Sequence, residues 1–510
     1  MEKQSDQSEL RKEKVELIRD LGINPYPYKY LPDTTASQIR QDYDAHGENT
    51  GKIYRIAGRL TAWRDHGNVT FAEIQDQSGT IQIYFQKSTL EDTKQKLANL
   101  LDLGDIIGIE GPSFKTRRGE ITIRVSNYDL LTKTLLPLPE KRHGLQDPEL
   151  KYRRRSEFLA TDSEQREVFS KRSRAISAMR EFLDKENFLE VEIPILQPVY
   201  GGASAKPFST HINALNETSF LSISPELYLK RLIAGGFERV YSIGKNFRNE
   251  GLDRTHNPEF TMMECYQSFA DYSDMMCLTE EMYSFIFNKV LGKTKIDYQN
   301  ITGKEKIELD FTPPWKRVKM LDVVREQTGI PVGDLSEEQL RDRLRKLEDP
   351  TFFSKAVPRK DLDTWCWGDL TQALFSHYVE PTLIQPTFII DHPRETTPLC
   401  KVHRLDSRLI ERFEPFAYGY ELGNAYSELN DPILQRKLLT EQVSSRESDE
   451  IPGEIDEDFC RAIDFGIPPT GGLGLGIDRL VMFLTNSHTI KDVILFPMMR
   501  RERQNGGREK

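Results

Sequence analysis

Hydrophobic and polar residues alternate in short segments in the first third of the chain, which predicts β-structure there. Segments such as "NVTFAEIQDQSG" and "TIQIYFQKS" are separated by turns that contain glycine. Short strands at this spacing, with a helix near "LEDTKQKLANLL", predict a five-stranded barrel of the oligonucleotide-binding (OB) type over residues 51–135. Residues 1–50 have a helical pattern interrupted at "NPYPYKYLPD", so a helical extension is expected ahead of the barrel.

The rest of the chain predicts a larger, mixed domain. A polar linker punctuated by proline is expected over 136–160, a domain over 161–502 and a short tail over 503–510. Within the domain, "SEQREVFSKRSRAISAMREFLDKENFLEVE" predicts a long helix that runs into a strand, and 330–390 predicts a helical insertion. The expected fold class is α+β, with a mixed domain of helices and strands behind an N-terminal β-barrel.

Residues 238–267 predict an antiparallel hairpin that carries many charges. "ERVYSIGKNFRNE" and "FTMMECYQ" both alternate, and the residues between them are typical of a loop. Period two puts Arg248 and Glu250 on one face of the first strand, and does the same for a set in the second strand, Phe260, Met262, Glu264 and Tyr266. A single Arg–Glu pair could be explained by the two side chains neutralising each other. The whole set instead indicates a site for a flat base, a phosphate and an amine, because buried unpaired charge is costly.

Composition excludes some classes of protein. The 510 residues are 37% hydrophobic and 29% charged, as in globular proteins of two or more domains, and no apolar run is long enough to span a bilayer. The five cysteines have neither metal nor disulfide spacing, which favours reduced thiols and a cytoplasmic location. A formal charge of −10 argues against general nucleic-acid affinity, although Lys115, Arg117 and Arg118 form a local basic segment.

Several motifs resemble those of the class II aminoacyl-tRNA synthetases. "FRNEGLDRTHNPEFTMMECY" (247–266) resembles the second signature motif, "GGLGLGIDRLVMFLTN" (471–486) the third, and "FLEVEIPIL" (188–196) the first, which forms the dimer interface in that class. Within the class, "GGASAKPF", "SPELYLKRLIAGGFERVY" and "YELGNAYSELNDP" are similar to bacterial-type lysyl-tRNA synthetases. The resemblance covers nearly the whole chain, in order, including the barrel. It implies an α+β fold with an antiparallel sheet flanked by helices behind the OB-fold barrel. It also implies activation of L-lysine with ATP, followed by transfer to the 3′ end of tRNA(Lys).

The resemblance implies the nucleotide-binding residues. Such an enzyme needs no serine or cysteine nucleophile, because the substrate carboxylate attacks the α-phosphate; it needs positioning and charge neutralisation. Arg248 would clamp the α-phosphate and the substrate carboxylate, and Arg479 would reach the γ-phosphate and cover the adenine. Paired with Asp478, Arg479 would instead be an ordinary helix-start residue. The remaining expected ATP contacts are Glu250, His256, Asn257, Phe260 and Gly476.

The resemblance also implies a lysine pocket and a magnesium site. Glu428 with Tyr266 is expected to bind the ε-ammonium, and Glu226 with Gly202 the α-amine. Asn424, Tyr426 and Glu428 share parity and should face one way; Glu264 adds a further carboxylate. Glu226 would also be favourable simply as a first-turn residue of a helix. Two more carboxylates, Glu414 and Glu421, would hold Mg²⁺ against the ATP phosphates, because Mg²⁺ prefers oxygen ligands.

The barrel resembles the family's anticodon-binding domain. Phe71, Gln82 and Glu120 match its base-stacking, base-bonding and acidic residues, although the parity of Phe71 fits the barrel core equally well. Lys151–Arg155 is either a tRNA contact or a solvated linker. The expected partners are tRNA(Lys), L-lysine, ATP and a second copy of the chain, with no membrane.

Two other functions remain open on the sequence. One is a paralogue that lysylates an acceptor other than tRNA, such as a protein; paralogues of that kind typically lack the anticodon domain. The other is a non-catalytic RNA-binding derivative, which would be expected to have lost Arg248, Arg479, Glu414 or Glu421. All four residues are present, so the sequence favours the ligase.

Overall fold

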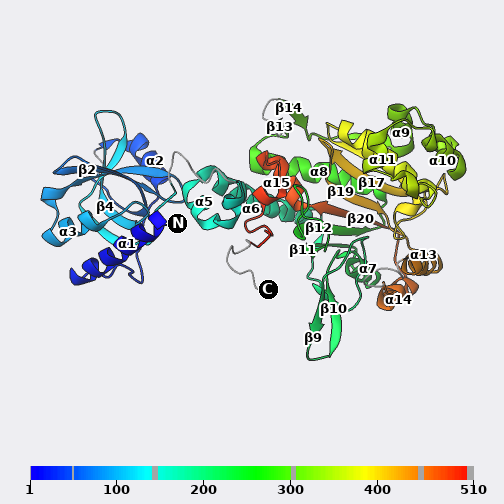
Figure 1. Ribbon diagram of the computed structural model, residues 1–510, viewed down its shortest axis with the longest axis horizontal. Helices are drawn as coiled ribbons and strands as arrows, with labels where there is room; N and C mark the ends of the chain where they lie inside the picture. Colours follow the sequence, from blue (N-terminus) through cyan, green and yellow to red (C-terminus); the bar gives the residue numbers. More distant parts are fainter. Residues whose placement is uncertain (1, 49–50, 140–147, 300–305, 446–452, 502–510) are drawn as a thin grey trace, which may run out of the picture. The chain divides into compact units, whose positions relative to one another are not determined.

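The computed structural model describes residues 2–48, 51–139, 148–299, 306–445 and 453–501 (Figure 1). It divides the chain into two compact units, Met1–Ser163 and Glu164–Lys510. The tail predicted over 503–510 and part of the predicted linker, 140–147, lie outside the described residues.

The first unit is a closed barrel preceded by two helices. The strands lie in the order β1-β2-β3-β5-β4-β6, and β1 also pairs with β4, which closes the sheet. There are six strands rather than five because "EITIRVSNYDLL" divides into β5 and β6, which pair with different parts of β4. The elements are α1 (Glu2–Asp20), α2 (Ala36–His46), β1 (Ile53–Asp65), β2 (Val69–Gln75), β3 (Thr80–Gln86), α3 (Asp92–Leu100), β4 (Ile106–Lys115), β5 (Ile121–Arg124), β6 (Asn127–Thr132), α4 (Pro148–Arg153) and α5 (Arg155–Thr161).

The second unit is built on a mixed sheet in the order β15-β16-β17-β19-β20-β12-β11-β7, with β18 paired to β17. Its interior pairings are antiparallel, whereas β15–β16 and β7–β11 at the two ends are parallel. The strands are β7 (Leu189–Glu190), β11 (Arg239–Phe247), β12 (Glu259–Ser268), β15 (Lys316–Lys319), β16 (Thr387–Pro393), β17 (Leu409–Ala417), β18 (Tyr420–Glu421), β19 (Gly423–Ser427) and β20 (Thr470–Gly476).

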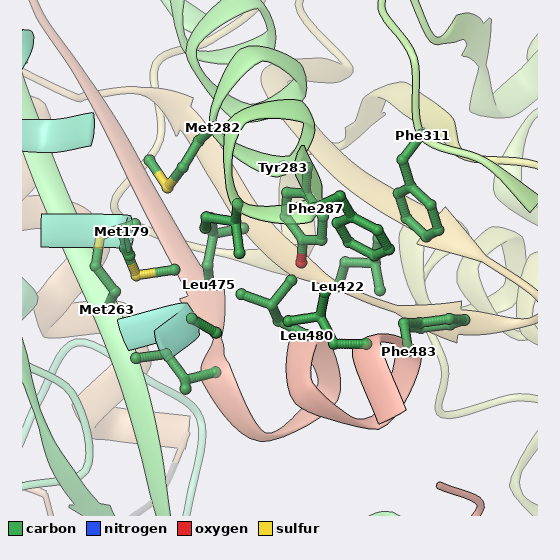
Figure 2. Close-up of a cluster of buried hydrophobic side chains, with 14 of the residues drawn as sticks. Met179, Met263, Met282, Tyr283, Phe287, Phe311, Leu422, Leu475, Leu480 and Phe483 are labelled. Carbon is green, nitrogen blue, oxygen red and sulfur yellow. The ribbon is translucent and has the colours of Figure 1, made fainter. Parts of the chain in front are cut away.

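Helices cover one face of this sheet. α6 (Ser163–Lys185), α8 (Tyr272–Leu291) and α15 (Ile477–Thr485) contribute to one large hydrophobic core. Figure 2 shows part of it: Leu475 of β20 lies beside Tyr283 of α8, and Met263 of β12 lies beside Met179 of α6. Because side chains alternate along a strand, the neighbours of these core residues must face the other side of the sheet.

The helical insertion lies between two strands of the sheet and has its own core. It comprises α9 (Met320–Thr328), α10 (Glu337–Arg345), α11 (Pro350–Lys355) and α12 (Trp367–Leu374). The segment predicted over 330–390 therefore overlaps it, but the last residues of that range belong to β16. The remaining elements are β8 (Leu196–Gln197), β9 (Ser209–Ile212), β10 (Glu217–Leu221), α7 (Glu226–Ala234), β13 (Lys295–Gln299), β14 (Lys306–Asp310), α13 (Pro432–Ser445), α14 (Glu457–Phe465) and α16 (Ile490–Val493).

Candidate active site

A cavity of about 410 Å³ lies on the face of the sheet opposite α8. Alternation along the strands produces it: Met263, Leu475 and Ala425 point into the core, and their neighbours point into the cavity. Of the residues predicted to bind ATP, lysine or metal, those that line it are Gly202, Glu226, Arg248, Glu250, His256, Asn257, Phe260, Glu264, Tyr266, Glu414, Glu421, Asn424, Tyr426, Gly476 and Arg479. Glu428 is the exception; it is buried, 1% exposed, directly behind the wall.

The charged hairpin differs from the prediction in one respect. Phe260, Met262, Glu264 and Tyr266 share one face of β12 and line the cavity, as predicted. Arg248 and Glu250, however, do not share a face of the first strand, because β11 ends at Phe247 and both residues lie in the loop that follows. The chain turns there because "NEGLD" is rich in loop-forming residues.

Arg248 is held against an aromatic ring. Its guanidinium carbon lies 5.1 Å from the centre of the Phe260 ring, and its Nε donates to the carbonyl of Ile223 over 3.4 Å. A guanidinium stacked on a ring keeps its N–H groups free at the edge, in the plane that suits phosphate or carboxylate oxygens. The arrangement thus presents a forked donor to the cavity.

The loop after Arg248 is organised by Asp253. Its carboxylate accepts hydrogen bonds from the backbone amides of Thr255 and His256 and contacts the His256 ring over 2.8 Å. Burial opposes ionisation of Asp253, but these bonds outweigh it and lower its pKa to about 2. Asn257 donates to the carbonyl of Glu259 over 2.6 Å. His256 and Asn257 are therefore held at the rim of the cavity.

The start of α15 carries the second cavity arginine. Arg479 donates to the carbonyl of Glu421 and lies 3.4 Å from its carboxylate. Asp478 is paired instead with Arg172 at 2.6 Å, so the alternative in which Arg479 merely pairs with Asp478 is wrong. At Gly476, an added Cβ would lie 4.0 Å from Arg479 Cβ and from the Leu422 carbonyl oxygen, which leaves the backbone of this strand end open to a ligand.

The opposite end of the cavity is acidic. Glu264 is 5% exposed and accepts hydrogen bonds from Ser224 Oγ at 2.8 Å and from the Tyr266 hydroxyl at 3.0 Å. Burial, together with the nearby charge of Glu226, raises the pKa of Glu264 to about 8. A carboxyl in this state exchanges its proton readily for another cation. The acidic end thus suits an ammonium group.

Glu226 and Glu428 meet a cation that sequence reasoning missed. Lys230 is fully buried on α7, with Nζ 2.6 Å from Glu226 Oε1 and in an ion pair with Glu428 Oε2. The Tyr426 hydroxyl donates to Glu226 Oε2 over 3.0 Å. The one signal in the sequence is the spacing of four between Glu226 and Lys230 on a helix, which is far more often a surface pair.

Two glycines make room for these carboxylates. At Gly472 an added Cβ would lie 1.9 Å from Glu428 Oε1 and 2.6 Å from the Tyr266 ring, so only glycine fits there. Gly202 has a φ of +83°, which disfavours any other residue, and a Cβ there would press on Ser224 and Glu226. Both residues are therefore needed to bring backbone and acidic groups together.

A second carboxylate group lies beside Arg479. Arg412 pairs with Glu414 and donates to Asn424 Oδ1 over 2.8 Å. Burial raises the pKa of Glu414 to about 7 despite Arg412, and the negative charges of Glu421 and Glu380 add to the effect. Arg412 and Glu380 are further charged groups of the site that sequence reasoning did not identify.

These carboxylates fit a divalent cation shared with a nucleotide. Among the described residues, no group of three or more His, Cys, Asp or Glu side chains is arranged to hold a metal by itself. Mg²⁺ is, however, commonly held by one or two carboxylates together with substrate phosphates. Burial is the main cause of the raised pKa of Glu414, and repulsion from Glu421 and Glu380 adds to it. A bound cation would offset this repulsion, so Glu414 and Glu421 suit it chemically.

The barrel residues predicted to read RNA lie outside its core. Phe71 is on the outward face of β2 and contacts Tyr84 of β3, with ring centres 5.2 Å apart. Gln82 lies on the same face and accepts a hydrogen bond from Thr122 at 2.8 Å. The interpretation of Phe71 as barrel core is therefore wrong. Glu120 is exposed beside Arg40, with 3.4 Å between them.

Comparison with known proteins assigns the family. A family model described as "tRNA synthetases class II (D, K and N)" matches residues 147–500, and one described as "OB-fold nucleic acid binding domain" matches residues 54–131. The chain belongs to the class II tRNA synthetases of the D, K and N group. This agrees with the predicted α+β fold behind an OB-fold barrel.

Within the group, this synthetase is most usefully compared with full-length relatives. It is 46% identical over 492 residues to the lysine–tRNA ligase of Clostridium novyi, and the matched region covers 96% of this chain and 94% of the relative. It is 47% identical over 493 residues to that of Carboxydothermus hydrogenoformans, covering 96% and 97%. In the part of the synthetase that the structure describes, no helix combines the length and apolar character needed to cross a membrane.

Proposed function

We propose that this synthetase is a lysine–tRNA ligase. It activates L-lysine with ATP to give lysyl-adenylate and pyrophosphate, and then transfers the lysyl group to the 3′ end of tRNA(Lys). The observation that carries the proposal is a single cavity with a guanidinium stacked on an aromatic ring at one end and buried carboxylates at the other. Similarity to lysine–tRNA ligases over nearly the whole chain supports it.

In the first step, a carboxylate oxygen of lysine attacks the α-phosphorus of ATP, and the bond to pyrophosphate breaks. The two reactants are both anionic, so their approach requires neutralisation and alignment. Arg248 is suited to both tasks because its N–H groups form a fork at the edge of the Phe260 ring. Arg479 would contact the γ-phosphate, while Phe260 holds the base with Glu250, His256, Asn257 and Gly476 around it.

In the second step, a ribose hydroxyl at the 3′ end of tRNA attacks the lysyl carbonyl, and AMP leaves.

Mg²⁺ bound to ATP would supply positive charge to the phosphates. Glu414 and Glu421 are the residues proposed to hold it, with Arg412 orienting Glu414. Their substitution by glutamine should raise the Mg²⁺ concentration needed for half-maximal activity without raising the KM for lysine.

Selection of lysine is assigned to the acidic end. Glu226 with Gly202 would bind the α-ammonium, and Glu428 with Tyr266 the ε-ammonium; Glu264, Asn424 and Tyr426 complete the pocket. A substrate with a side-chain carboxylate would meet like charge here and be rejected. The buried position of these groups strengthens that discrimination, because few waters screen the charges.

The barrel is proposed to bind the anticodon. Phe71 would stack on a base, and Gln82 and Glu120 would contact base edges, on the face where Tyr84 and Phe114 add further rings. Lys115, Arg117 and Arg118 are exposed at one end of this face and suit phosphates. The barrel also argues against the paralogue that lysylates a protein, which would have no use for it.

We further propose a cytoplasmic homodimer. The segment that resembles the first motif exposes large apolar side chains at the edge strand β7 and beyond it: Leu189 at 49%, Ile195 at 48% and Leu196 at 48%. A second copy packed on this edge would cover them and pair β7. Light scattering of the purified protein tests this; a mass of one chain at micromolar concentration would contradict it.

ATP–pyrophosphate exchange tests the enzymatic proposal. Exchange should require L-lysine and Mg²⁺, and Arg248→Ala should lower kcat by about a hundredfold or more. Arg325→Ala is the matched control, because the Arg325 side chain is 67% exposed and forms an ion pair with the exposed Asp334 at 3.8 Å. Exchange that proceeds equally with any amino acid, or an Arg248→Ala variant as active as the control, would refute the assignment.

A further inference from the structure

Lys230 is an ammonium group enclosed among the acidic residues of the site, behind the wall of the cavity. It lies on α7, four residues after Glu226, and its side chain is 0% exposed. Its Nζ is 2.6 Å from Glu226 and contacts Glu428, which follows the distant strand β19. A single cation therefore connects the two carboxylates that the proposed function assigns to the two ammonium groups of lysine.

The geometry of Lys230 fixes the orientation of Glu226. One oxygen of that carboxylate is held by Lys230, and the other accepts the hydrogen bond of the Tyr426 hydroxyl at 3.0 Å. The Tyr426 ring also lies 5.8 Å from the Lys230 ammonium. Burial opposes the charge on Lys230, but Glu226 and Glu428 outweigh burial and raise its pKa. The cation therefore persists without solvent.

Lys230 also changes the charge of the pocket. Glu226, Glu264 and Glu428 are buried together, and when all three are ionised they carry three negative charges. The ammonium of Lys230 reduces this to two. L-Lysine brings two ammonium groups, and its carboxylate is directed to Arg248. With Lys230 in place and all three carboxylates ionised in the complex with lysine, the charge of the pocket thus equals and opposes that of the two ammonium groups of one substrate molecule.

We propose that Lys230 is a positioning residue for substrate selection: by tying Glu226 to Glu428 it aims both carboxylates and matches the pocket to a diammonium substrate. The inference rests on the proposed lysine–tRNA ligase function and assigns the selectivity of that site to a residue outside the cavity wall. Lys230 acts through the carboxylates and does not touch the substrate.

Two variants test the inference in the full-length protein. Lys230→Met removes the charge at similar length, and Lys230→Arg keeps the charge but replaces a compact ammonium by a larger planar fork that displaces the carboxylates. The matched control is Lys295→Met, because Lys295 pairs with Asp310 at 3.1 Å on an exposed hairpin. The measured quantities are the KM values for lysine and ATP in exchange, and the inhibition constant of L-norleucine, which lacks the ε-ammonium.

Lys230→Met should raise the KM for lysine by about tenfold or more, since a charge-assisted contact is misaligned. The KM for ATP should change by less than about threefold. The inhibition constant of norleucine, which has the α-ammonium but lacks the ε-ammonium, should rise by a smaller factor than the KM for lysine. Lys230→Arg should also raise the KM for lysine, by a smaller factor. This variant tests the inference if Lys230→Met does not fold. A Lys295→Met variant should match the wild type.

Other results overturn the inference. If lysine, ATP and norleucine weaken in parallel, Lys230 merely supports the fold; if the lysine KM is unchanged in a folded variant, Lys230 has no part in selection. Failure of the proposed function is distinguishable, because the wild-type protein itself would then show no lysine-dependent exchange. Wild-type activity with unaltered selectivity in both variants would contradict only the role of Lys230.

Discussion

Asp478 accepts a hydrogen bond from the backbone amide of Thr261 over 2.8 Å and so ties the start of α15 to β12. The same carboxylate, 2% exposed, pairs with Arg172 of α6 at 2.6 Å. Each end of this contact lies next to a cavity residue, Arg479 on the helix and Phe260 on the strand. The contact therefore sets the spacing between the two side chains proposed to enclose the adenine.

Asp478→Ala should destabilise the protein and impair catalysis. Removing the carboxylate takes the ion-pair partner from Arg172, which keeps its hydrogen bonds to Val493 and Thr261, and leaves the buried amide of Thr261 without its acceptor. The loss should cost about 3 kcal/mol of unfolding free energy. The measurement is chemical denaturation, with the KM for ATP from exchange. Asp458→Ala should have no effect on either, because Asp458 is 73% exposed in a pair of 3.4 Å. Equal effects of the two substitutions would contradict the role given to Asp478.

Lysine binding should release a proton at neutral pH. Glu264 has a pKa of about 8 in the empty cavity, and an ammonium favours its ionised form. Below pH 8, binding of lysine must therefore displace the proton of Glu264. The affinity for lysine should fall by up to about tenfold for each unit by which the pH is lowered. Calorimetric titration of lysine at pH 7 in two buffers of different ionisation enthalpy measures the release. Glu264→Gln should abolish it; no release from the wild-type protein would sink the prediction.

The same carboxyl should make the empty protein less stable as pH rises. In the fold Glu264 keeps its proton up to about pH 8, whereas the unfolded chain loses it near 4.5. The protonated group thus contributes stability that is complete below pH 4.5 and is lost as pH rises through about 8. Thermal melts across this range should show the loss, and Glu264→Gln should reduce it. A wild-type slope identical to that of the variant would contradict the assignment.

Glu428→Gln should raise the KM for lysine about tenfold or more and leave the KM for ATP nearly unchanged. The substitution removes a carboxylate from the acidic end. Of the two ion pairs of Lys230, only the one with Glu226 remains. Steady-state exchange with each substrate varied in turn gives both constants. A similar rise in both would show that Glu428 serves the fold rather than lysine.

Phe71→Ala should weaken tRNA charging and leave exchange intact. Stacking on an aromatic side chain is worth about 1–3 kcal/mol per base, so the KM for tRNA(Lys) should rise by about tenfold or more. Aminoacylation of a transcribed tRNA measures this beside exchange. Tyr28→Ala is the control, because the Tyr28 side chain is fully exposed. Loss of exchange in Phe71→Ala would instead indicate a defect of folding.

Local alternation predicted much of the site. Period two placed Phe260, Met262, Glu264 and Tyr266 on one face, and the structure confirms that face. The argument works there because β12 is central, with a core on one side and a cavity on the other, so each position has only two choices. Where the strand ended, at Phe247, alternation no longer applied, and the shared face predicted for Arg248 and Glu250 was wrong.

Long-range pairing was beyond prediction. Lys230 meets Glu428 only because α7 packs on β11 and β12 while β19 approaches from another part of the sheet. Nothing in the residues around position 230 distinguishes a buried cation from an exposed lysine of an amphipathic helix. The face of Phe71 was equally undetermined, since a barrel strand offers an aromatic ring two environments of similar chemistry. Both the contact of Lys230 and the face of Phe71 depend on how distant segments pack together in the folded chain.

The opposite orientations of neighbouring residues in β12 and β20 make this enzyme more sensitive to insertion than to replacement. One extra residue in either strand would shift the register by a single step and exchange the two faces over the remaining length. With the extra residue in β12 ahead of Met263, Met263 would face the cavity and Glu264 would be forced against the helices of the core. Single replacements on the open face, by contrast, alter substrate choice while the packed face stays intact, so selectivity can change in small steps without loss of the fold.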